Sequence, residues 1–169
     1  LAAKALYEFV WDEYCDWYLE MAKVELARAD AAGDHAAARG TRAMLVRELE
    51  ATLRLAHPFM PFITEELWQT VAPLAGKSGG TIARAPFPKP NSGLRFPRDE
   101  ARVALLKGIV DAVRSLRSAM GLAPGAKVDV LVAGDAAADG VAEFRPYAMA
   151  LARLSDFRIV DALPVADAP

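Results

Sequence analysis

A long apolar stripe at helical spacing is the feature that most constrains how this chain folds. Residues 2 to about 31 are expected to form one helix, and between Leu6 and Met21 large side chains recur every three or four positions. The stripe consists of Leu6, Val10, Tyr14, Trp17, Tyr18 and Met21. This spacing places them on one face of a single long helix, and Gly33 is expected to end that helix.

A second long helix is expected directly after the first. Asp34 is a suitable cap for its N-terminus, and the helical pattern continues to about Ala56. The predicted buried stripe of this helix consists of Met44, Leu45, Leu49, Leu53 and Ala56. Because the turn between the two helices is so short, we expect them to pack antiparallel.

Prolines divide the middle of the chain. The His57-Pro58 pair is expected to break the second helix, and Pro61 adds a further bend. Thr64 is then predicted to cap a short helix that ends at Pro73.

Residues 74–97 are rich in Gly, Pro, Ser and Lys, which predicts an extended connector over the surface of the bundle. Ile82 and Phe87 are expected to fill apolar grooves along its path.

The C-terminal part combines another long helix with a small α/β segment. The helix is expected from Asp99 to Gly121, with Pro124 just beyond it. Residues 127–133 alternate and are β-branched, which predicts a strand; a loop at 134–140, a helix over 141–154 and a strand over 157–160 follow. Strand, helix and strand in this order favour parallel pairing with a right-handed crossover.

The expected fold is therefore mainly α, an antiparallel helical bundle with a small C-terminal α/β unit. We expect two domains. The bundle covers residues 1–122 and includes the connector, and the strand–helix–strand unit covers residues 123–169 and packs on the bundle.

Composition limits the possible function classes. Of 169 residues, 54% are hydrophobic and 25% are charged, as in soluble globular proteins. No apolar run approaches the roughly 18–20 residues of a membrane span, and no signal-peptide pattern is visible, so we expect a cytoplasmic protein with no membrane partner. The first residue, Leu1, falls within a helical pattern, which suggests a piece of a longer protein.

Few residues are suited to metal binding or nucleophilic catalysis. The single cysteine, Cys15, lies among aromatic residues and cannot form an internal disulfide. His35 is expected to be solvated in a turn, and His57 to lie at the core edge with a hydrogen bond to the backbone. We therefore predict no metal site and no catalytic residue.

Four acidic residues follow one another at i,i+4 steps in the first helix, namely Glu8, Asp12, Asp16 and Glu20. Like charges at this spacing cost about 0.2–0.5 kcal/mol per pair, so a compensating partner is expected. A carboxylate pair for acid–base chemistry or a divalent cation is one interpretation. We favour ion pairing with arginines of the other long helices. The candidates are Arg39, Arg42, Arg47, Arg54 and Arg114.

The net charge of −2 means that RNA binding would require Lys and Arg to gather on one face. Arg114 and Arg117, with Arg102 and Lys107 one or two turns earlier, are suited to phosphate contacts. A solvated or salt-bridged face is the equally open alternative.

Aromatic side chains could stack on bases, although core packing is favoured for most of them. The set comprises Phe9, Trp11, Trp17, Phe59, Phe62 and Trp68, of which Phe9 falls off the main stripe and is expected to be exposed. Gly76-Lys77-Ser78 imitates the end of a phosphate-binding loop. Val71 stands where that motif needs Gly and no strand precedes it, so we reject this interpretation.

Several segments in succession resemble one family. They are LYEFVWDEYCDWYLE, TRAMLVRELEATLRLAHPFMPFITEELWQ, IARAPFPKP and IVDAVRSLRSAMGLAPGAKVDVLV. In this order they resemble the anticodon-binding domain of bacterial valyl-tRNA synthetases, strongly from residue 1 to residue 132 and more loosely beyond. HPFMPFITEELW alone would indicate only the wider group of synthetases for valine, isoleucine, leucine and methionine.

The resemblance implies a helical domain that cradles the anticodon stem of valine tRNA, with no DNA partner. In the parent enzyme, ATP would be used by a separate catalytic domain, so no cofactor is expected here. This chain has neither a HIGH nor a KMSKS signature, so no adenylation activity is expected from it. The tRNA-contact candidates are Arg42, Arg114 and Arg117, chosen on charge and position alone.

The resemblance also predicts that the bundle lacks its first helix, and that the coiled-coil arm of valyl enzymes would follow residue 169. The parent is expected to be a monomer, whereas this chain could self-associate through the apolar groove left exposed. Two alternatives remain open at this point: the same domain of an isoleucyl or leucyl enzyme, and a helical protein-interaction module.

Overall fold

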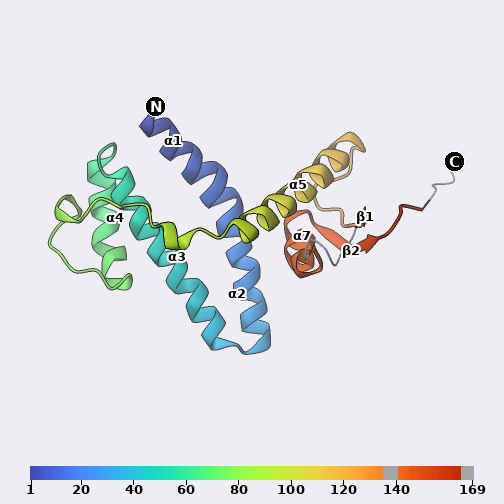
Figure 1. The fold of residues 1–169 in the computed structure, drawn as a ribbon, viewed down its shortest axis with the longest axis horizontal. Helices are drawn as coiled ribbons and strands as arrows, with labels where there is room; N and C mark the ends of the chain where they lie inside the picture. The colour runs from blue at the N-terminus through green and yellow to red at the C-terminus, as the bar shows by residue number, and fades with distance from the viewer. Residues whose placement is uncertain (135–140, 165–169) are drawn as a thin grey trace. The chain divides into compact units, whose positions relative to one another are not determined.

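The computed structural model describes residues 1–134 and 141–164. Its contacts divide the chain into two compact units, Leu1–Ser92 and Gly93–Pro169. We call them the N-terminal and the C-terminal unit and describe each by itself (Figure 1). The division falls well before residue 122, where the sequence places the end of the bundle. The predicted domain limits stay a prediction.

The N-terminal unit begins with three helical segments that follow one another without a break: α1 (Ala2–Glu8), η1 (Phe9–Leu19) and α2 (Glu20–Ala32). The expected single long helix is thus present, but its middle part, η1, is a π-helix. A π-helix forms i→i+5 hydrogen bonds, so its wider turn changes which side chains share a face. The middle of the first helix thus departs from the α-helical spacing on which the predicted stripe rests.

The predicted stripe is only partly buried. Trp17 is buried, whereas Leu6, Val10 and Tyr14 are only half-buried. Two aromatic pairs are four residues apart in this helix. The rings of Tyr7 and Trp11 lie 6.1 Å apart and nearly parallel, whereas those of Tyr14 and Tyr18 lie 5.6 Å apart and are tilted by 38°.

The turn into α3 (His35–Ala56) follows the expected chemistry. Gly33 adopts φ +66°, a left-handed conformation that suits glycine at a helix end. The Asp34 carboxylate accepts hydrogen bonds from the backbone N–H groups of Ala36 and Ala37 at 3.1 and 2.9 Å. Figure 1 shows α2 and α3 side by side and antiparallel, which confirms the predicted hairpin.

The next helix, α4 (Pro61–Leu74), differs from the prediction at both ends. It begins at Pro61, because proline has no N–H to leave unpaired in a first turn and its φ already suits a helix. Thr64 lies inside the helix and does not cap it: its hydroxyl donates to the Met60 carbonyl at 2.7 Å. Pro73 lies within the last turn of α4, which continues to Leu74, so it does not end the helix as predicted.

The core of the N-terminal unit joins α3, α4 and the connector. It consists of buried Leu53, Trp68, Ala72 and Ile82. The predicted burial of Ile82 is confirmed, but Phe87 is 60% exposed, so its predicted groove is wrong. The buried stripe of α3 begins later along the chain than expected, since Met44 is 46% exposed.

The connector contains two short 3-10 turns, η2 (Ile82–Arg84) and η3 (Ser92–Leu94), in an otherwise extended segment. The Thr81 hydroxyl caps η2 by accepting from the Ala83 N–H at 3.2 Å.

The C-terminal unit contains α5 (Pro97–Ala119), β1 (Val128–Ala133), η4 (Val141–Phe144), α7 (Arg145–Leu151) and β2 (Leu154–Val160). The two strands pair in parallel, as predicted. Two expected boundaries are wrong: α7 ends before residue 154, and β2 begins at that residue, because buried Leu154 already pairs with Val128. The predicted loop at 134–140 lies outside the described residues from position 135 onward.

The helix α5 supplies a buried face to this unit. Leu106 and Val110 have no exposed surface, and Ala148 of α7 and Phe157 of β2 are also buried. Contacts between α5 and α7 place the helix of the small α/β segment against the long helix. The mainly α fold with a small C-terminal α/β unit is thus confirmed. Among the described residues, no helix has the length and apolar character of a membrane span.

Candidate functional site

Arg42, the first predicted tRNA contact, lies on α3 in the N-terminal unit. Its side chain is 57% exposed, and Nη2 lies 3.6 Å from Oδ1 of Asp30 on α2. A pair this exposed is weak and leaves the guanidinium available to a stronger anion.

Arg114 and Arg117, the other two predicted contacts, both lie on α5 in the C-terminal unit. The Arg114 guanidinium lies 3.8 Å from the Asp111 carboxylate and donates to the Leu151 carbonyl at 3.3 Å. Arg117 donates to the Ala126 carbonyl at 2.6 Å, so it also holds the turn after α5. The structure brings these two arginines onto one helix, whereas Arg42 belongs to the other unit. Their contact with tRNA stays a prediction.

The predicted ion pairs between the acidic residues of the first helix and distant arginines are wrong for the two outer acids. Glu8 pairs with Lys4, and Glu20 pairs with Lys23, each within the same continuous helix. Within residues 1–134 and 141–164, no group of three His, Cys, Asp or Glu side chains is placed to hold a metal ion.

The aromatic side chains divide between core and surface. Trp17 and Trp68 are buried and Phe9 is 44% exposed, as expected. The favoured core packing is wrong for Trp11, Phe59 and Phe62. These are 57%, 47% and 90% exposed, respectively.

A buried polar cluster connects α3 with α4. Glu50 is only 2% exposed, and its carboxylate accepts hydrogen bonds from Arg54 Nε and Nη2, both at 2.8 Å. Trp68 Nε1 donates to the same carboxylate at 2.9 Å. We call these residues the Glu50 cluster (Glu50, Arg54 and Trp68). The fork of the guanidinium matches the two carboxylate oxygens, which makes this one of the stronger pairs available to a protein.

The Glu50 cluster keeps its carboxylate ionised. Burial by itself would raise the pKa of Glu50, but hydrogen bonds from Arg54 and Trp68 and the nearby charges of Arg54 and Lys77 lower this pKa below its usual value. The remaining donor of Arg54, Nη1, reaches the Pro86 carbonyl at 2.6 Å and so fixes the connector against α3.

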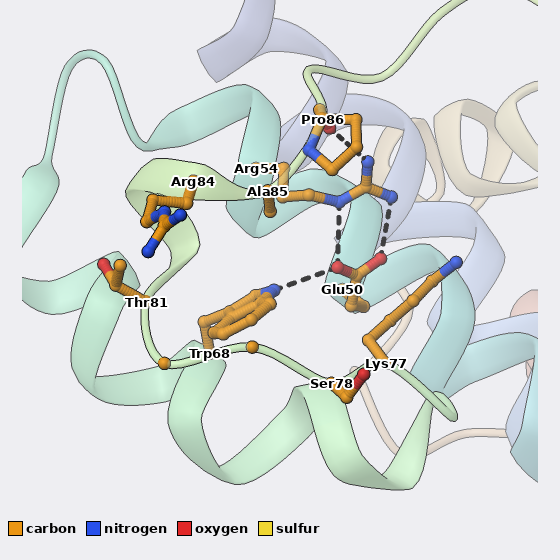
Figure 2. A pocket seen from close by; sticks show the side chains of 11 residues that line it. Glu50, Arg54, Trp68, Lys77, Ser78, Thr81, Arg84, Ala85 and Pro86 are labelled. Atoms are coloured by element: carbon orange, nitrogen blue, oxygen red, sulfur yellow. Dashed lines mark hydrogen bonds and ion pairs between the residues drawn. The ribbon is translucent and has the colours of Figure 1, made fainter.

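A cavity of ≈ 420 Å³ opens beside this cluster (Figure 2). Besides the Glu50 cluster, it is lined by residues of the connector: Lys77, Ser78, Gly79, Gly80, Thr81, Arg84, Ala85 and Pro86. Gly79 approaches the Trp68 ring so closely that an added Cβ would lie 3.4 Å from it. Three of the charged lining residues are cations and one is an anion.

A second carboxylate, Glu65, holds the start of η2. It accepts from the Thr81 hydroxyl at 2.6 Å and from the Ile82 N–H at 3.2 Å. The hydrogen bond from Thr81, followed by that from Gln69, lowers the pKa of Glu65, although partial desolvation opposes the shift.

His57 lies half-buried at the C-terminal end of α3, as expected for a core-edge histidine. Its partner is a side chain and not the expected backbone group, since Nδ1 lies 2.8 Å from the Thr64 hydroxyl oxygen.

The sequence alone does not predict the Glu50 cluster or its cavity. The i,i+4 spacing of Glu50 and Arg54 predicts a surface pair on a helix. The burial of this pair depends on Trp68, which comes from another helix, and on the connector. No local sequence pattern predicts that these segments meet.

Comparison with known proteins identifies the class. The family model described as the anticodon-binding domain of tRNA ligase matches residues 1–132. The chain therefore belongs to this family of anticodon-binding domains, which confirms the predicted family.

Three relatives that match nearly the whole chain are valine–tRNA ligases. The valine–tRNA ligase of Laribacter hongkongensis is 50% identical over 170 residues, which cover 100% of this chain and 17% of the relative. That of Dechloromonas aromatica is 49% identical over 97% of this chain and 17% of the relative. That of Chromobacterium violaceum is 46% identical over 100% of this chain and 18% of the relative. The chain thus spans less than a fifth of the length of these relatives.

Proposed function

We propose that this chain is the part of a valine–tRNA ligase that holds the anticodon stem of valine tRNA. The observation that carries the proposal is the family match over residues 1–132, together with 50% identity to a valine–tRNA ligase across the whole chain. The similar proteins named here are all valine ligases, which favours this assignment over an isoleucyl or leucyl enzyme.

The proposed mechanism is binding without catalysis in this part of the chain. The ligase as a whole would activate valine with ATP and transfer it to tRNA. This domain would fix the tRNA so that its distant acceptor end reaches the active site. We place the ligase in the cytoplasm, as a monomer that uses no cofactor in this domain.

Arg42, Arg114 and Arg117 are the proposed phosphate contacts. Arg42 and Arg114 support this role by their exposure, with side chains that are 57% and 48% exposed. Arg117 is less available, because two backbone carbonyls already accept from its Nη2. We therefore expect Arg42 and Arg114 to contribute more to binding than Arg117.

Salt-dependent binding of valine tRNA tests the proposal. Each phosphate contact releases counterions, so replacing one contacting arginine reduces the salt slope of log K by about 1. Arg42→Gln and Arg114→Gln are expected to weaken binding and lower the slope. Arg98→Gln, at the exposed start of α5, serves as the matched control. Absence of tRNA binding at low salt would overturn the proposed function, and unchanged slopes in both variants would overturn these site residues.

The exposed apolar side chains suggest one further property. We propose that this chain self-associates when it is separated from the rest of the ligase, because Tyr7, Trp11 and Phe62 are all more than half exposed. Light scattering coupled to size-exclusion chromatography tests this. A concentration-independent monomer mass would contradict it.

A further inference from the structure

The lining of the cavity beside Trp68 carries more positive than negative charge. Its lining contains Arg54, Lys77 and Arg84 against the single acid Glu50. The Arg54 charge is already matched by Glu50 through two hydrogen bonds. Lys77 and Arg84 therefore remain as two additional cations on the connector.

These two cations have no strong partner of their own. Neither Lys77 nor the Arg84 side chain forms an ion pair or hydrogen bond with any residue in the described part of the chain. Lys77 is close enough to contribute to the field at Glu50, but that carboxylate is occupied by Arg54 and Trp68. Cations held in a cavity without a counter-ion favour binding of an anion.

The connector also offers neutral donors to the cavity. Ser78 lines it, and the backbone N–H groups of Ser78, Gly79 and Gly80 form no hydrogen bond with another described residue. The two glycines have no side chains to block access to these N–H groups. An anion at this position would meet several N–H and O–H donors in addition to two charges, as phosphate groups require.

The positions of the cations limit the size of the ligand. In the view of Figure 2, Arg84 and Lys77 lie on opposite sides of the Trp68 indole. The cavity volume of ≈ 420 Å³ is within the range of small-molecule sites, which is roughly 300–1,000 Å³. A ligand with two separated anionic groups fits this arrangement better than a single small ion.

We propose that this cavity binds a ligand carrying two or more phosphate groups, with Lys77 and Arg84 as the principal contacts. The source of the phosphates is either an RNA backbone or a free polyphosphate, because the recognising chemistry is the same. This site differs from a nucleotide-binding P-loop. Lys77 follows the C-terminus of α4, so side-chain charge and loop amides would hold the anion without help from a helix N-terminus.

Thermal unfolding of the full chain, followed by tryptophan fluorescence, tests the site. All three tryptophans (Trp11, Trp17 and Trp68) belong to the N-terminal unit, so the signal reports the unit that contains the cavity. Pyrophosphate, inorganic phosphate and a uridine tetranucleotide are each titrated against sodium chloride at equal ionic strength. A ligand that binds only the folded state raises the Tm in a saturable way.

We expect pyrophosphate or the tetranucleotide to bind more tightly than inorganic phosphate. The double variant Lys77→Gln/Arg84→Gln is expected to weaken that binding by about tenfold, equivalent to about 1.4 kcal/mol. Arg39→Gln, an exposed cation elsewhere in the same unit, should leave the binding unchanged. Lys77→Arg keeps the charge and should therefore retain most of the binding. This result would show that the loss in the double variant is not a folding defect.

The two sources are separated by which probe saturates at lower concentration. Preference for the tetranucleotide assigns the site to RNA, and preference for pyrophosphate assigns it to a free polyphosphate. Equal Tm values in all probes and in chloride would overturn the proposal, as would saturation unchanged by the double variant. None of these probes carries an anticodon stem. The result of this test is therefore independent of whether the chain binds the anticodon stem of tRNA.

Discussion

Replacing Glu50 by Gln tests a deeply buried polar interaction of the N-terminal unit. Glu50 is 2% exposed and accepts three hydrogen bonds, at 2.8, 2.8 and 2.9 Å. A glutamine preserves the shape but turns an N–H₂ group toward a donor. The Arg54 charge is then left without its counter-ion in a poorly hydrated position.

The structure sets the expected size of the loss. Breaking a buried ion pair by removing one partner costs about 3–5 kcal/mol. The Arg54 side chain is 17% exposed and can recover some hydration, so we expect the lower end of this range, about 3 kcal/mol. A loss of this size is large compared with the total stability of a small domain.

Urea unfolding monitored by tryptophan fluorescence measures this loss. The midpoint should fall while the slope m stays constant, since the surface exposed on unfolding is unchanged. Glu66→Gln, at an exposed position of α4, is the matched control and should change the free energy of unfolding by less than about 0.5 kcal/mol.

A double-mutant cycle with Arg54→Gln separates the ion pair from other effects. Once Glu50 is replaced, removing the Arg54 charge should cost much less than it does in the wild type, or even restore stability. If Glu50→Gln is no more destabilising than the Glu66 control, or if the two losses simply add, the reasoning about this cluster is wrong.

Three further predictions concern stability. Because the folded pKa of Glu50 lies below that of an unfolded glutamate, about 4.3, its stabilisation is present above that pH and is lost as pH falls through the folded pKa. Acid titrations of the unfolding free energy should show a smaller decrease for Glu50→Gln than for the wild type. Asp34→Ala removes two N-cap hydrogen bonds and should cost about 1 kcal/mol in urea unfolding, whereas Asp34→Asn should retain most of the stability. Ile82→Ala, at a side chain 2% exposed, should cost about 2–4 kcal/mol, and a loss below about 1 kcal/mol would show that η2 does not anchor the connector.

Local chemistry explains which parts of the fold follow from sequence. The turn between α2 and α3 depends on a glycine in a left-handed conformation and an aspartate that caps the next helix. Both effects operate within a few residues, so Gly33 and Asp34 predict the turn without knowledge of the rest of the chain.

Where two local signals compete, the sequence does not show which one determines the structure. Thr64 is a good N-cap residue, but Pro61 begins the same helix one turn earlier, and the Thr64 hydroxyl is used inside it. The π-helical turn of η1 leaves no signature in residue spacing, since apolar periodicity of three to four residues is typical of an α-helix as well.

The geometry of the candidate site depends on tertiary structure. Arg42, Arg114 and Arg117 could be selected by charge, because cations are the residues that contact phosphate. Glu50 and Arg54 could be recognised as a pair by their spacing. Their burial, and the cavity next to them, arise only when α4 and the connector close over α3. Such long-range contacts are not encoded by any periodic pattern.

Binding of the isolated anticodon stem-loop is the measurement that tests the central claim most directly. Fluorescence anisotropy at low salt would compare the anticodon stem-loop of valine tRNA with the same stem-loop carrying a different anticodon. The proposed function predicts that the valine stem-loop binds and that its affinity falls as the salt concentration rises, because phosphates are the proposed contacts. Binding to neither stem-loop would contradict the claim that this chain holds the anticodon stem, and tighter binding of the valine version would show that anticodon bases are contacted as well.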